Sequence, residues 1–505
     1  MMHDASMLTR LYTRRMSDRA HPHQPSVAII GAGFGGMVVA LRLQQQGHTN
    51  FTIYEKADDL GGTWRDNTYP GAACDIPSHL YSISFEPKAD WSRKYPPQQE
   101  IFDYMEEIYE RRGLHSRTRF STNITELRFD EGRSAWQLST TTDEIEADVV
   151  VVCTGLLSKP HVPDIPGLAD FEGAVWHSME WDHEHDLSDE RVAVIGTGAS
   201  AIQFTPEIAP YAAATTVYQR TAPWIVPRDD RPYARWRTWM YRYVPGMRRL
   251  HRAKIYLRQE MLAIGLLGKA SWMIKGATKM AGGFLEAQVP DGELRAKVTP
   301  TYEFGCKRVI VSDDWYPTLT RADVDLVTDP IDRVVADGII TTDGTHRPCD
   351  AIALGTGFRT WEIMSPLKVF GRDGLELNDK WSDNAETHLG ISVAGFPNLF
   401  MVTGPGTGLG HNSMIFMIEA AANMTVGAIE HLGQRGPGST VDVRAEIAAA
   451  SYAELQERME GTVWASGCSS WYLTDSGRNE LLWPGFTTEY RRKTRRFIPA
   501  DYLQL

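Results

Sequence analysis

The run VAII at residues 27–30 leads directly into the glycine-rich turn GAGFGG at 31–36, and the run VAVI at 192–195 leads in the same way into GTGASA at 196–201. Each run predicts a buried parallel strand, and each turn predicts the start of a helix. Glycines at such a turn let the backbone approach a pyrophosphate, which then lies at the helix N-terminus. The two stretches therefore predict an α/β fold with two Rossmann-like dinucleotide-binding domains.

The residue at the ribose position differs between the two units. Counting 24 residues on from Gly31 reaches Glu55, whereas the same count from Gly196 reaches Arg220. A carboxylate accepts hydrogen bonds from a ribose diol, and a guanidinium pairs with the ribose 2'-phosphate that a carboxylate would repel. The sequence therefore predicts FAD in the first unit and NADPH in the second. The alternative is a pair of ordinary sheet turns without ligands, and the two matched ribose positions argue against it.

Size and charge narrow the class of protein. A chain of 505 residues is long enough for two or three domains. Its net charge of -12 argues against nucleic acid as a partner and favours small molecules. No stretch reaches the roughly 18 consecutive apolar residues that span a bilayer. Residues 1–24 carry four arginines but no continuous apolar run, so we expect a flexible N-terminal tail rather than a secretory signal, and a cytoplasmic location.

The five cysteines support the same expectation of a reducing compartment. They are widely scattered and include no Cys-x-x-Cys pair: Cys74, Cys153, Cys306, Cys349 and Cys468. This spacing argues against a zinc site, a disulfide framework and a redox-active disulfide. We therefore expect no metal in the site.

Changes of pattern along the chain predict three structural units. The buried-strand run ADVVVVCTG at 147–155 ends the first part and is followed by a proline-rich linker, and the similar run AIALGTG at 351–357 ends the second. We expect an FAD-binding domain at 25–158 and 362–505, a linker and NADPH-binding domain at 159–227 and 301–361, and a helical insertion at 228–300.

The insertion is rich in arginine and aromatic residues. Trp236, Met240 and Tyr243 follow helical spacing, and seven arginines lie between 231 and 252. This composition fits either a helix on a membrane surface or a solvated face above an aromatic core. We favour the second, which leaves peripheral membrane contact as the alternative.

A second glycine-rich loop, GPGTGLGHNS at 404–413, precedes the apolar helical run MIFMIE at 414–419. A helix N-terminus that points at a flavin ring would stabilise the negative charge of reduced flavin. The alternative is a simple turn in which Asn412 or Ser413 caps the helix.

The linker stretch FEGAVWHSMEWD at 171–182 resembles the fingerprint of type I Baeyer-Villiger monooxygenases, a family of class B flavoprotein monooxygenases. Relatives that oxygenate nitrogen or sulfur usually lack the final pair that Trp181 and Asp182 provide, so this pair favours ketone oxidation. We expect His177 to couple domain movement to catalysis as a packed linker residue, without touching substrate. Two departures from the family pattern, at Ala73 and at Asp182, bear on substrate preference.

The glycine patterns and the resemblance together assign the cofactor contacts. FAD contacts are expected at Gly31, Gly33, Gly36, Glu55, Gly62, Thr63, Trp64, Asp75, Tyr81, Ile124 and Met414, and NADPH contacts at Gly196, Thr197, Gly198, Ser200, Arg220, Thr221, Lys307 and Trp471.

The resemblance also implies an activity: insertion of one oxygen atom from O2 beside a ketone carbonyl, through a C4a-peroxyflavin, to give an ester or lactone. A buried arginine suits the anionic steps because it stays charged. We expect Arg308 to hold the peroxide and the tetrahedral adduct, and Asp75 to orient Arg308. The alternatives are a flavin monooxygenase that oxidises soft nitrogen or sulfur, an NADPH oxidase or reductase, and an inactive flavin-binding scaffold.

Overall fold

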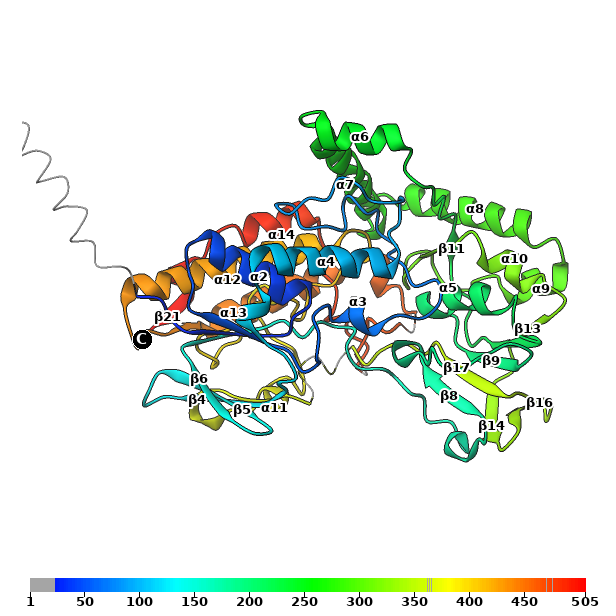
Figure 1. The fold of residues 1–505 in the computed structure, drawn as a ribbon, viewed down its shortest axis with the longest axis horizontal. Helices are drawn as coiled ribbons and strands as arrows, with labels where there is room; N and C mark the ends of the chain where they lie inside the picture. Colours follow the sequence, from blue (N-terminus) through cyan, green and yellow to red (C-terminus); the bar gives the residue numbers. More distant parts are fainter. Residues whose placement is uncertain (1–22, 361, 363, 365, 469, 475) are drawn as a thin grey trace, which may run out of the picture.

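The computed structural model describes residues 23–505 except 361, 363, 365, 469 and 475, so most of the expected N-terminal tail lies outside the described residues. Two five-stranded parallel sheets lie in separate halves of the molecule, and a group of helices projects beside them (Figure 1). This arrangement agrees with the expected α/β fold that contains two Rossmann-like units and a helical insertion.

The first sheet has the strand order β19-β7-β1-β2-β3. Its strands are β1 (Val27–Ile30), β2 (Phe51–Tyr54), β3 (Thr118–Arg119), β7 (Val149–Val152) and β19 (Leu399–Met401). Every residue of β1 and β7 is buried, as expected of apolar runs covered on both faces. Helices α2 (Phe34–Gln45) and α12 (Met414–Arg435) pack against each other beside this sheet, so the last third of the chain completes the first unit.

The second sheet has the order β13-β10-β9-β17-β8. Its strands are β8 (Ala174–His177), β9 (Arg191–Ile195), β10 (Ala214–Tyr218), β13 (Val324–Val327) and β17 (Ala351–Leu354). Helices α5 (Ala199–Ile208) and α10 (Trp315–Leu319) pack together beside it. The first nucleotide strand has a central place in each sheet, so the chain uses the same layout twice.

Smaller elements cover the two sheets. A four-stranded sheet combines β4 (Ile124–Asp130), β5 (Ala135–Thr140), β6 (Glu144–Ala147) and β18 (Lys368–Phe370), and a three-stranded one combines β14 (Ile331–Val335), β15 (Gly338–Thr341) and β16 (His346–Pro348). β20 (Val441–Val443) pairs with β21 (Tyr502–Gln504). The remaining helices outside the insertion are α3 (Thr63–Asp66), α4 (Gln98–Arg112), α11 (Leu377–Lys380), α13 (Ala445–Met459) and α14 (Thr487–Lys493).

The insertion consists of α6 (Arg235–Tyr243), α7 (Met247–Leu266), α8 (Ser271–Gln288) and α9 (Gly292–Lys297). The short strands β11 (Ile225–Val226) and β12 (Ile310–Val311) pair on either side of it and close it at its base. The inner face of α7 reaches the first unit, because Glu260 accepts hydrogen bonds from Asn412 Nδ2 at 2.8 Å and from Thr487 Oγ1 at 2.7 Å. The insertion therefore packs on the loop before α12.

The prediction of an aromatic core beneath α6 is wrong for most of the aromatic residues of this helix. Tyr241 is buried, but Trp236, Trp239 and Tyr243 are 59%, 57% and 62% exposed. Helical spacing correctly placed several of these rings on one side, but spacing alone does not show whether that side meets protein or solvent.

No helix of the described residues is long and apolar enough to cross a membrane.

The cysteine spacing argues against a disulfide framework, and it does not reveal the disulfide that the structure contains. Cys306 and Cys468 form a disulfide across a sequence separation of 162, while Cys74, Cys153 and Cys349 are free and buried. Spacing in the sequence hides such a pair, because only the packing of distant segments brings its two members together. The described residues contain no cluster of His, Cys, Asp or Glu suited to a metal ion.

Candidate active site

The first glycine turn is packed so tightly that side chains would not fit. Gly31 has φ of +104°, and a Cβ there would lie 2.6 Å from the carbonyl oxygen of Cys153. A Cβ on Gly36 would lie 2.0 Å from the carbonyl oxygen of Gly31. Gly33 precedes α2 as its N-cap in extended backbone, without a side-chain cap. The turn leaves the backbone N–H groups at the start of α2 available to a phosphate, as FAD requires.

Glu55 lies just after β2 and is held beside this turn. Its carboxylate accepts hydrogen bonds from the backbone N–H of Ala32 at 2.8 Å and of Ala57 at 3.0 Å, and from Arg65 at 3.2 Å. The side chain is almost fully buried. A surface hollow lined by Lys56, Arg65 and Asn123 among others opens next to it. A fixed carboxylate at this place fits the recognition of a ribose diol.

The remaining residues expected to contact FAD come from four separate segments. Gly62 has φ of +53° and lies against Gly33, and Thr63 follows it at the exposed start of α3. The indole N–H of Trp64 donates to the hydroxyl of Tyr81 at 3.1 Å, so the structure brings these two rings together. By contrast, Ile124 packs in a hydrophobic core cluster at the start of β4.

The loop before α12 provides a second test of whether a flavin fits. Met414 is the first residue of α12, and Ser413 is its N-cap without a side-chain cap. Ser413 is fully buried, and its hydroxyl has no hydrogen-bond partner among the described residues. Asn412 turns its amide toward Glu260. The capping alternative is therefore not realised, and the open helix end fits a polar ligand such as a flavin ring.

The second glycine turn repeats the geometry of the first. Gly196 has φ of +108°, and a Cβ there would lie 2.5 Å from the carbonyl oxygen of Gly355. Gly198 precedes α5 in extended backbone, again without a side-chain cap. Thr197 Oγ1 donates to the carbonyl oxygen of Thr221 at 3.1 Å, and Ser200 lies in the first turn of α5. This turn is more open than the first, since Gly198 is exposed.

The residues expected to bind the 2'-phosphate come from two distant segments. Arg220 follows β10 and is exposed, and Lys307 lies beyond the insertion. Burial lowers the pKa of Lys307, and the positive charge of Arg220 lowers it further. Two cations close enough to repel each other in this way are suited to binding a dianionic phosphate.

Arg308 and Asp75 form an ion pair between the two units, 233 residues apart in sequence. Arg308 donates from Nε at 2.9 Å and from Nη2 at 2.5 Å to the same carboxylate oxygen, Oδ2 of Asp75. The Asp75 carboxylate raises the pKa of Arg308 above its ordinary value, so the guanidinium stays charged. Both side chains keep part of their surface exposed, so the pair remains open to a ligand.

Trp471, which the family resemblance places among the NADPH contacts, differs in burial from the residue that follows it. The Trp471 side chain is 41% exposed, whereas Tyr472 is buried and its hydroxyl has no hydrogen-bond partner among the described residues. Burial raises the pKa of Tyr472 to about 12, and the charge of Arg308 acts in the opposite direction. Tyr472 therefore lies within the electrostatic reach of Arg308, which no motif in the sequence indicated.

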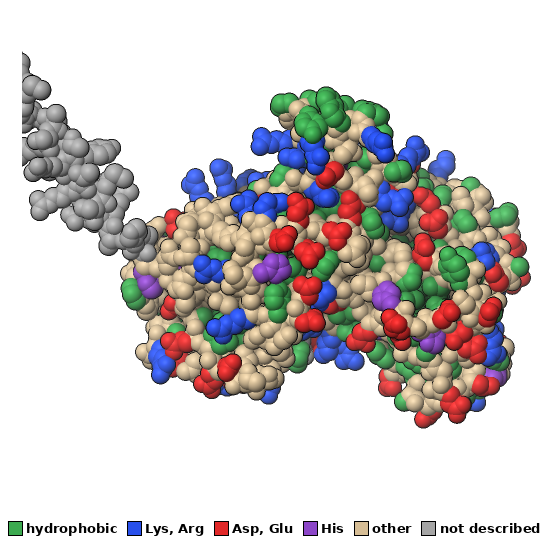
Figure 2. Space-filling view, viewed as in Figure 1, with side chains coloured by type: hydrophobic (Ala, Val, Ile, Leu, Met, Phe, Trp, Pro, Cys, Tyr) green, Lys and Arg blue, Asp and Glu red, His purple; other side chains and the backbone are tan. Residues whose placement is uncertain are grey.

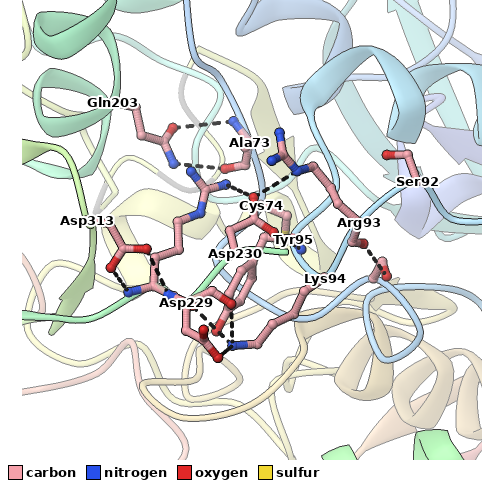
Figure 3. Close-up of polar contacts among 12 residues, drawn as sticks. Ala73, Cys74, Ser92, Arg93, Lys94, Tyr95, Gln203, Asp229, Asp230 and Asp313 are labelled. Atoms are coloured by element: carbon pink, nitrogen blue, oxygen red, sulfur yellow. Dashed lines mark hydrogen bonds and ion pairs between the residues drawn. The ribbon is translucent and has the colours of Figure 1, made fainter. Parts of the chain in front are cut away.

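Gln203 is a second residue that sequence reasoning missed. It lies on α5, behind the NADPH turn, and its amide both accepts from and donates to the backbone of Ala73 (Figure 3), at 3.4 and 3.0 Å. The hydroxyl of Tyr69 donates to the same amide at 2.9 Å. Gln203 thus connects the NADPH-binding helix to the segment that carries Asp75. Its spacing in α5 gave no signal, because an amide on a helix face is common.

The start of the insertion contacts the same segment (Figure 3). Lys94 pairs with Asp229 at 3.7 Å, and Arg93 pairs with Asp230 at 3.0 Å. The carboxylate of Asp313 accepts from the backbone N–H groups of Arg228 and Asp229. These contacts hold the first unit, the insertion and the segment that follows Arg308 close together.

His177 uses both ring nitrogens in the linker. Nδ1 accepts from the backbone N–H of Met179 at 3.1 Å, and Nε2 lies 2.9 Å from the carbonyl oxygen of Gly357. Burial lowers the pKa of His177, which favours the neutral ring that this pairing needs. This geometry supports the expected role as a packed linker residue.

Comparison with known proteins decides the family. A model of the pyridine nucleotide-disulphide oxidoreductase family matches residues 28–265, which include both glycine turns. A Baeyer-Villiger monooxygenase of Streptomyces coelicolor is 42% identical over 486 residues, covering 96% of this chain and 93% of the relative. Another, from Pseudomonas aeruginosa, is 44% identical and covers 94% and 90%. The chain belongs to the Baeyer-Villiger monooxygenase family.

A solved structure of an oxidised steroid monooxygenase bound to NADP resembles this monooxygenase with a TM-score of 0.85 at 30% identity, covering 95% of this chain and 99% of that chain. The expected fold class, the FAD- and NADPH-dependent class of enzyme and the family resemblance are thereby confirmed. The roles of individual residues stay predictions.

Proposed function

We propose that this monooxygenase converts a ketone and O2 into an ester or lactone and that Arg308 stabilises the negative charge that develops beside the carbonyl. The observation that carries this proposal is the Arg308–Asp75 pair, which lies between the two nucleotide-binding units. FAD, once reduced by NADPH, supplies the activated oxygen. Residues of this chain bind the two cofactors and stabilise the developing charge.

Arg308 suits its task because its charge is fixed and its orientation is set. Nε and Nη2 donate to Asp75, while Nη1 has no acceptor among the described residues and remains available to an oxyanion. Charge-stabilising donors that are already oriented lower a barrier more than mobile ones, since they need no reorganisation during the reaction. Asp75 is a positioning residue in this proposal, because it acts through Arg308.

The cofactor contacts follow from the two turns. FAD would be held by Gly31, Gly33, Gly36 and Gly62 at the backbone, by Glu55 at the ribose, and by the segments of Trp64, Tyr81, Asp75 and Met414, with Ile124 behind them. NADPH would be held by Gly196, Thr197, Gly198 and Ser200 at the pyrophosphate, and by Arg220, Thr221 and Lys307 at the 2'-phosphate. We also propose the domain boundaries at 158/159, 227/228, 300/301 and 361/362, which lie outside all strands of the two parallel sheets.

The proposal is tested by following NADPH oxidation by the FAD-loaded protein in air. The assay includes cyclic, aryl and aliphatic ketones and one thioether, and mass spectrometry identifies the products. We expect ester or lactone in proportion to the NADPH consumed. Sulfoxide without ester would support oxygenation of sulfur instead, and hydrogen peroxide without oxygenated product would indicate an oxidase.

A further inference from the structure

The tip of the insertion presents an exposed apolar surface. Figure 2 shows apolar side chains gathered at the top of the molecule, in the region where Figure 1 places α6. We call this surface and its continuation along α7 the apolar cap; α6 contributes Trp236, Trp239 and Tyr243, and α7 contributes Leu250, Leu257 and Met261, each at least 55% exposed. Contiguous exposed surfaces of this kind usually mark an interaction site.

The α7 part of the cap has the pattern of an amphipathic helix. Leu250, Leu257 and Met261 recur at helical spacing on its exposed face, while Glu260, to one side of this face, and Ala263, opposite it, are buried against the protein. One side of the helix thus packs against the rest of the protein, and another presents apolar side chains to solvent. The outer one has no partner among the described residues.

Basic side chains surround the cap. Residues 235–288 contain eleven Lys and Arg but only two Glu and no Asp, although the whole chain has a net charge of -12. Figure 2 shows blue side chains directly below the apolar tip. Arg235, Arg237, Arg249 and Lys254 of this stretch are exposed. None of the four forms an ion pair with another described residue, unlike Arg242, which pairs with Asp90 at 3.0 Å.

This combination distinguishes between two possible occupants. We call Arg235, Arg237, Arg249 and Lys254 the basic collar. A second copy of the chain would bring two such collars together, and like charges at close range oppose such a dimer. An anionic lipid surface offers acyl chains for the tryptophans and phosphates for the arginines. Trp and Tyr also prefer the boundary between apolar and polar layers of a bilayer. Charge complementarity therefore favours a membrane.

We propose that the apolar cap and its basic collar dock this monooxygenase on anionic lipid membranes as a peripheral protein. The rings of Trp236 and Trp239 enter the boundary of the acyl chains, and Arg237 and Arg249 bind lipid phosphates. The insertion contacts the loop before α12 through Glu260 and Asn412, so α7 links the docked cap to the first unit. This inference does not depend on which ketone is oxidised.

The test is cosedimentation of the full FAD-loaded chain with vesicles of phosphatidylcholine alone or with added phosphatidylglycerol. We expect binding to the anionic vesicles that weakens with salt. Removing a basic residue near a lipid surface weakens binding about fivefold, so Arg237→Gln with Arg249→Gln should weaken it roughly 25-fold. Trp236→Ser with Trp239→Ser should reduce binding at least tenfold. All variants should oxidise NADPH at the rate of the parent.

Matched controls replace exposed residues outside the cap. Tyr211→Ser and Lys368→Gln should bind vesicles like the parent, since both side chains lie elsewhere on the surface. Equal binding of parent and cap variants, or no binding to anionic vesicles, would overturn the proposal. Concentration-dependent dimerisation in analytical ultracentrifugation that the two Trp→Ser changes abolish would overturn it too, because it would assign the cap to a second copy.

Discussion

The two nucleotide-binding units use one backbone device with different surroundings. Gly31 and Gly196 have nearly the same φ, +104° and +108°, and each lies under a carbonyl oxygen at the end of another strand of its sheet. The first turn is covered by neighbouring segments, and its ribose residue Glu55 is buried. The second turn is exposed at Gly198, and its ribose residue Arg220 is exposed as well.

This difference teaches how one fold can hold a resident and an exchanging cofactor. The glycines fix the phosphate position in both units, so they carry no information about which nucleotide binds or how long it stays. We propose that the residue after the second strand sets the choice of ribose and that the burial around the turn sets the ease of exchange. The following predictions test this separation of roles.

The largest effect is expected at the ion pair between the two units. Arg308→Ala leaves both turns intact but removes the proposed oxyanion donor, so ester formation should fall about a hundredfold to a thousandfold. Reduction of FAD by NADPH, followed as loss of flavin absorbance without oxygen, should continue at a substantial rate. Arg308→Lys tests the need for the guanidinium, since it keeps the charge but loses the fork. Ester formation near the parent rate in Arg308→Ala would refute the assignment.

A smaller effect is expected at the NADPH ribose position. Arg220→Ala should raise the KM for NADPH about tenfold to a hundredfold, because a hydrogen bond to a charged group contributes about 1.5–3 kcal/mol. The KM for NADH should change little, since NADH lacks the 2'-phosphate. Steady-state assays with both nucleotides measure the ratio. Equal increases for the two would show that Arg220 does not read the phosphate.

The matching change in the first unit should affect a different cofactor. Glu55→Gln weakens the acceptor for the FAD ribose and its bond from Arg65, so the Kd for FAD should rise about tenfold. Flavin content after gel filtration and titration of the apoprotein measure this. The KM for NADPH serves as the internal control and should stay within about twofold. A rise in that KM with unchanged FAD affinity would contradict the assignment of FAD to this unit.

The smallest effects are those of pH on the stability of the folded state, and this dependence has opposite signs for one group in each unit. Burial raises the pKa of Asp442 in β20 to about 6, so the folded state binds this proton more tightly and loses stability as pH rises from 4 to 6. Burial lowers the pKa of His177, so the folded state loses stability as pH falls below the ordinary value of 6.5. The Asp442 shift corresponds to about 3 kcal/mol. Between pH 4 and pH 6, the Tm of the Asp442→Asn variant should fall less than the Tm of the parent, because the variant lacks this titrating group. An unchanged pH profile of Tm would contradict it.

Sequence patterns predicted the parts of this molecule that depend on local geometry. The two glycine turns, the acid at Glu55 and the base at Arg220 were all found from spacing, because a strand, a tight turn and a helix impose fixed distances along the chain. The helical insertion was found from the change of periodicity after residue 228. The family resemblance added the pairing of Arg308 with Asp75, which the structure contains.

The remaining features depend on packing between distant segments. Tyr472 is buried whereas Trp471 is exposed, and the burial of adjacent aromatic residues in a loop cannot be distinguished before the loop is placed. Gln203 contacts Ala73 across 130 residues, and the exposure of Trp236 depends on what covers α6. The Cys306–Cys468 bond likewise depends on the packing of segments that are far apart in the sequence. Such contacts have no signature in local spacing.

The disulfide gives the chain an unusual topology. It closes a covalent ring of the residues between Cys306 and Cys468, and this ring contains β13 and β17 of the second sheet and β19 and α12 of the first unit. Each of the two sheets therefore contributes strands to one closed loop. While the bond is intact, the two units remain tied even if their interface opens, and the range of their relative rotation is set by a tether as well as by the linkers. Reducing conditions would turn this ring back into an open chain with greater freedom of movement between the cofactors.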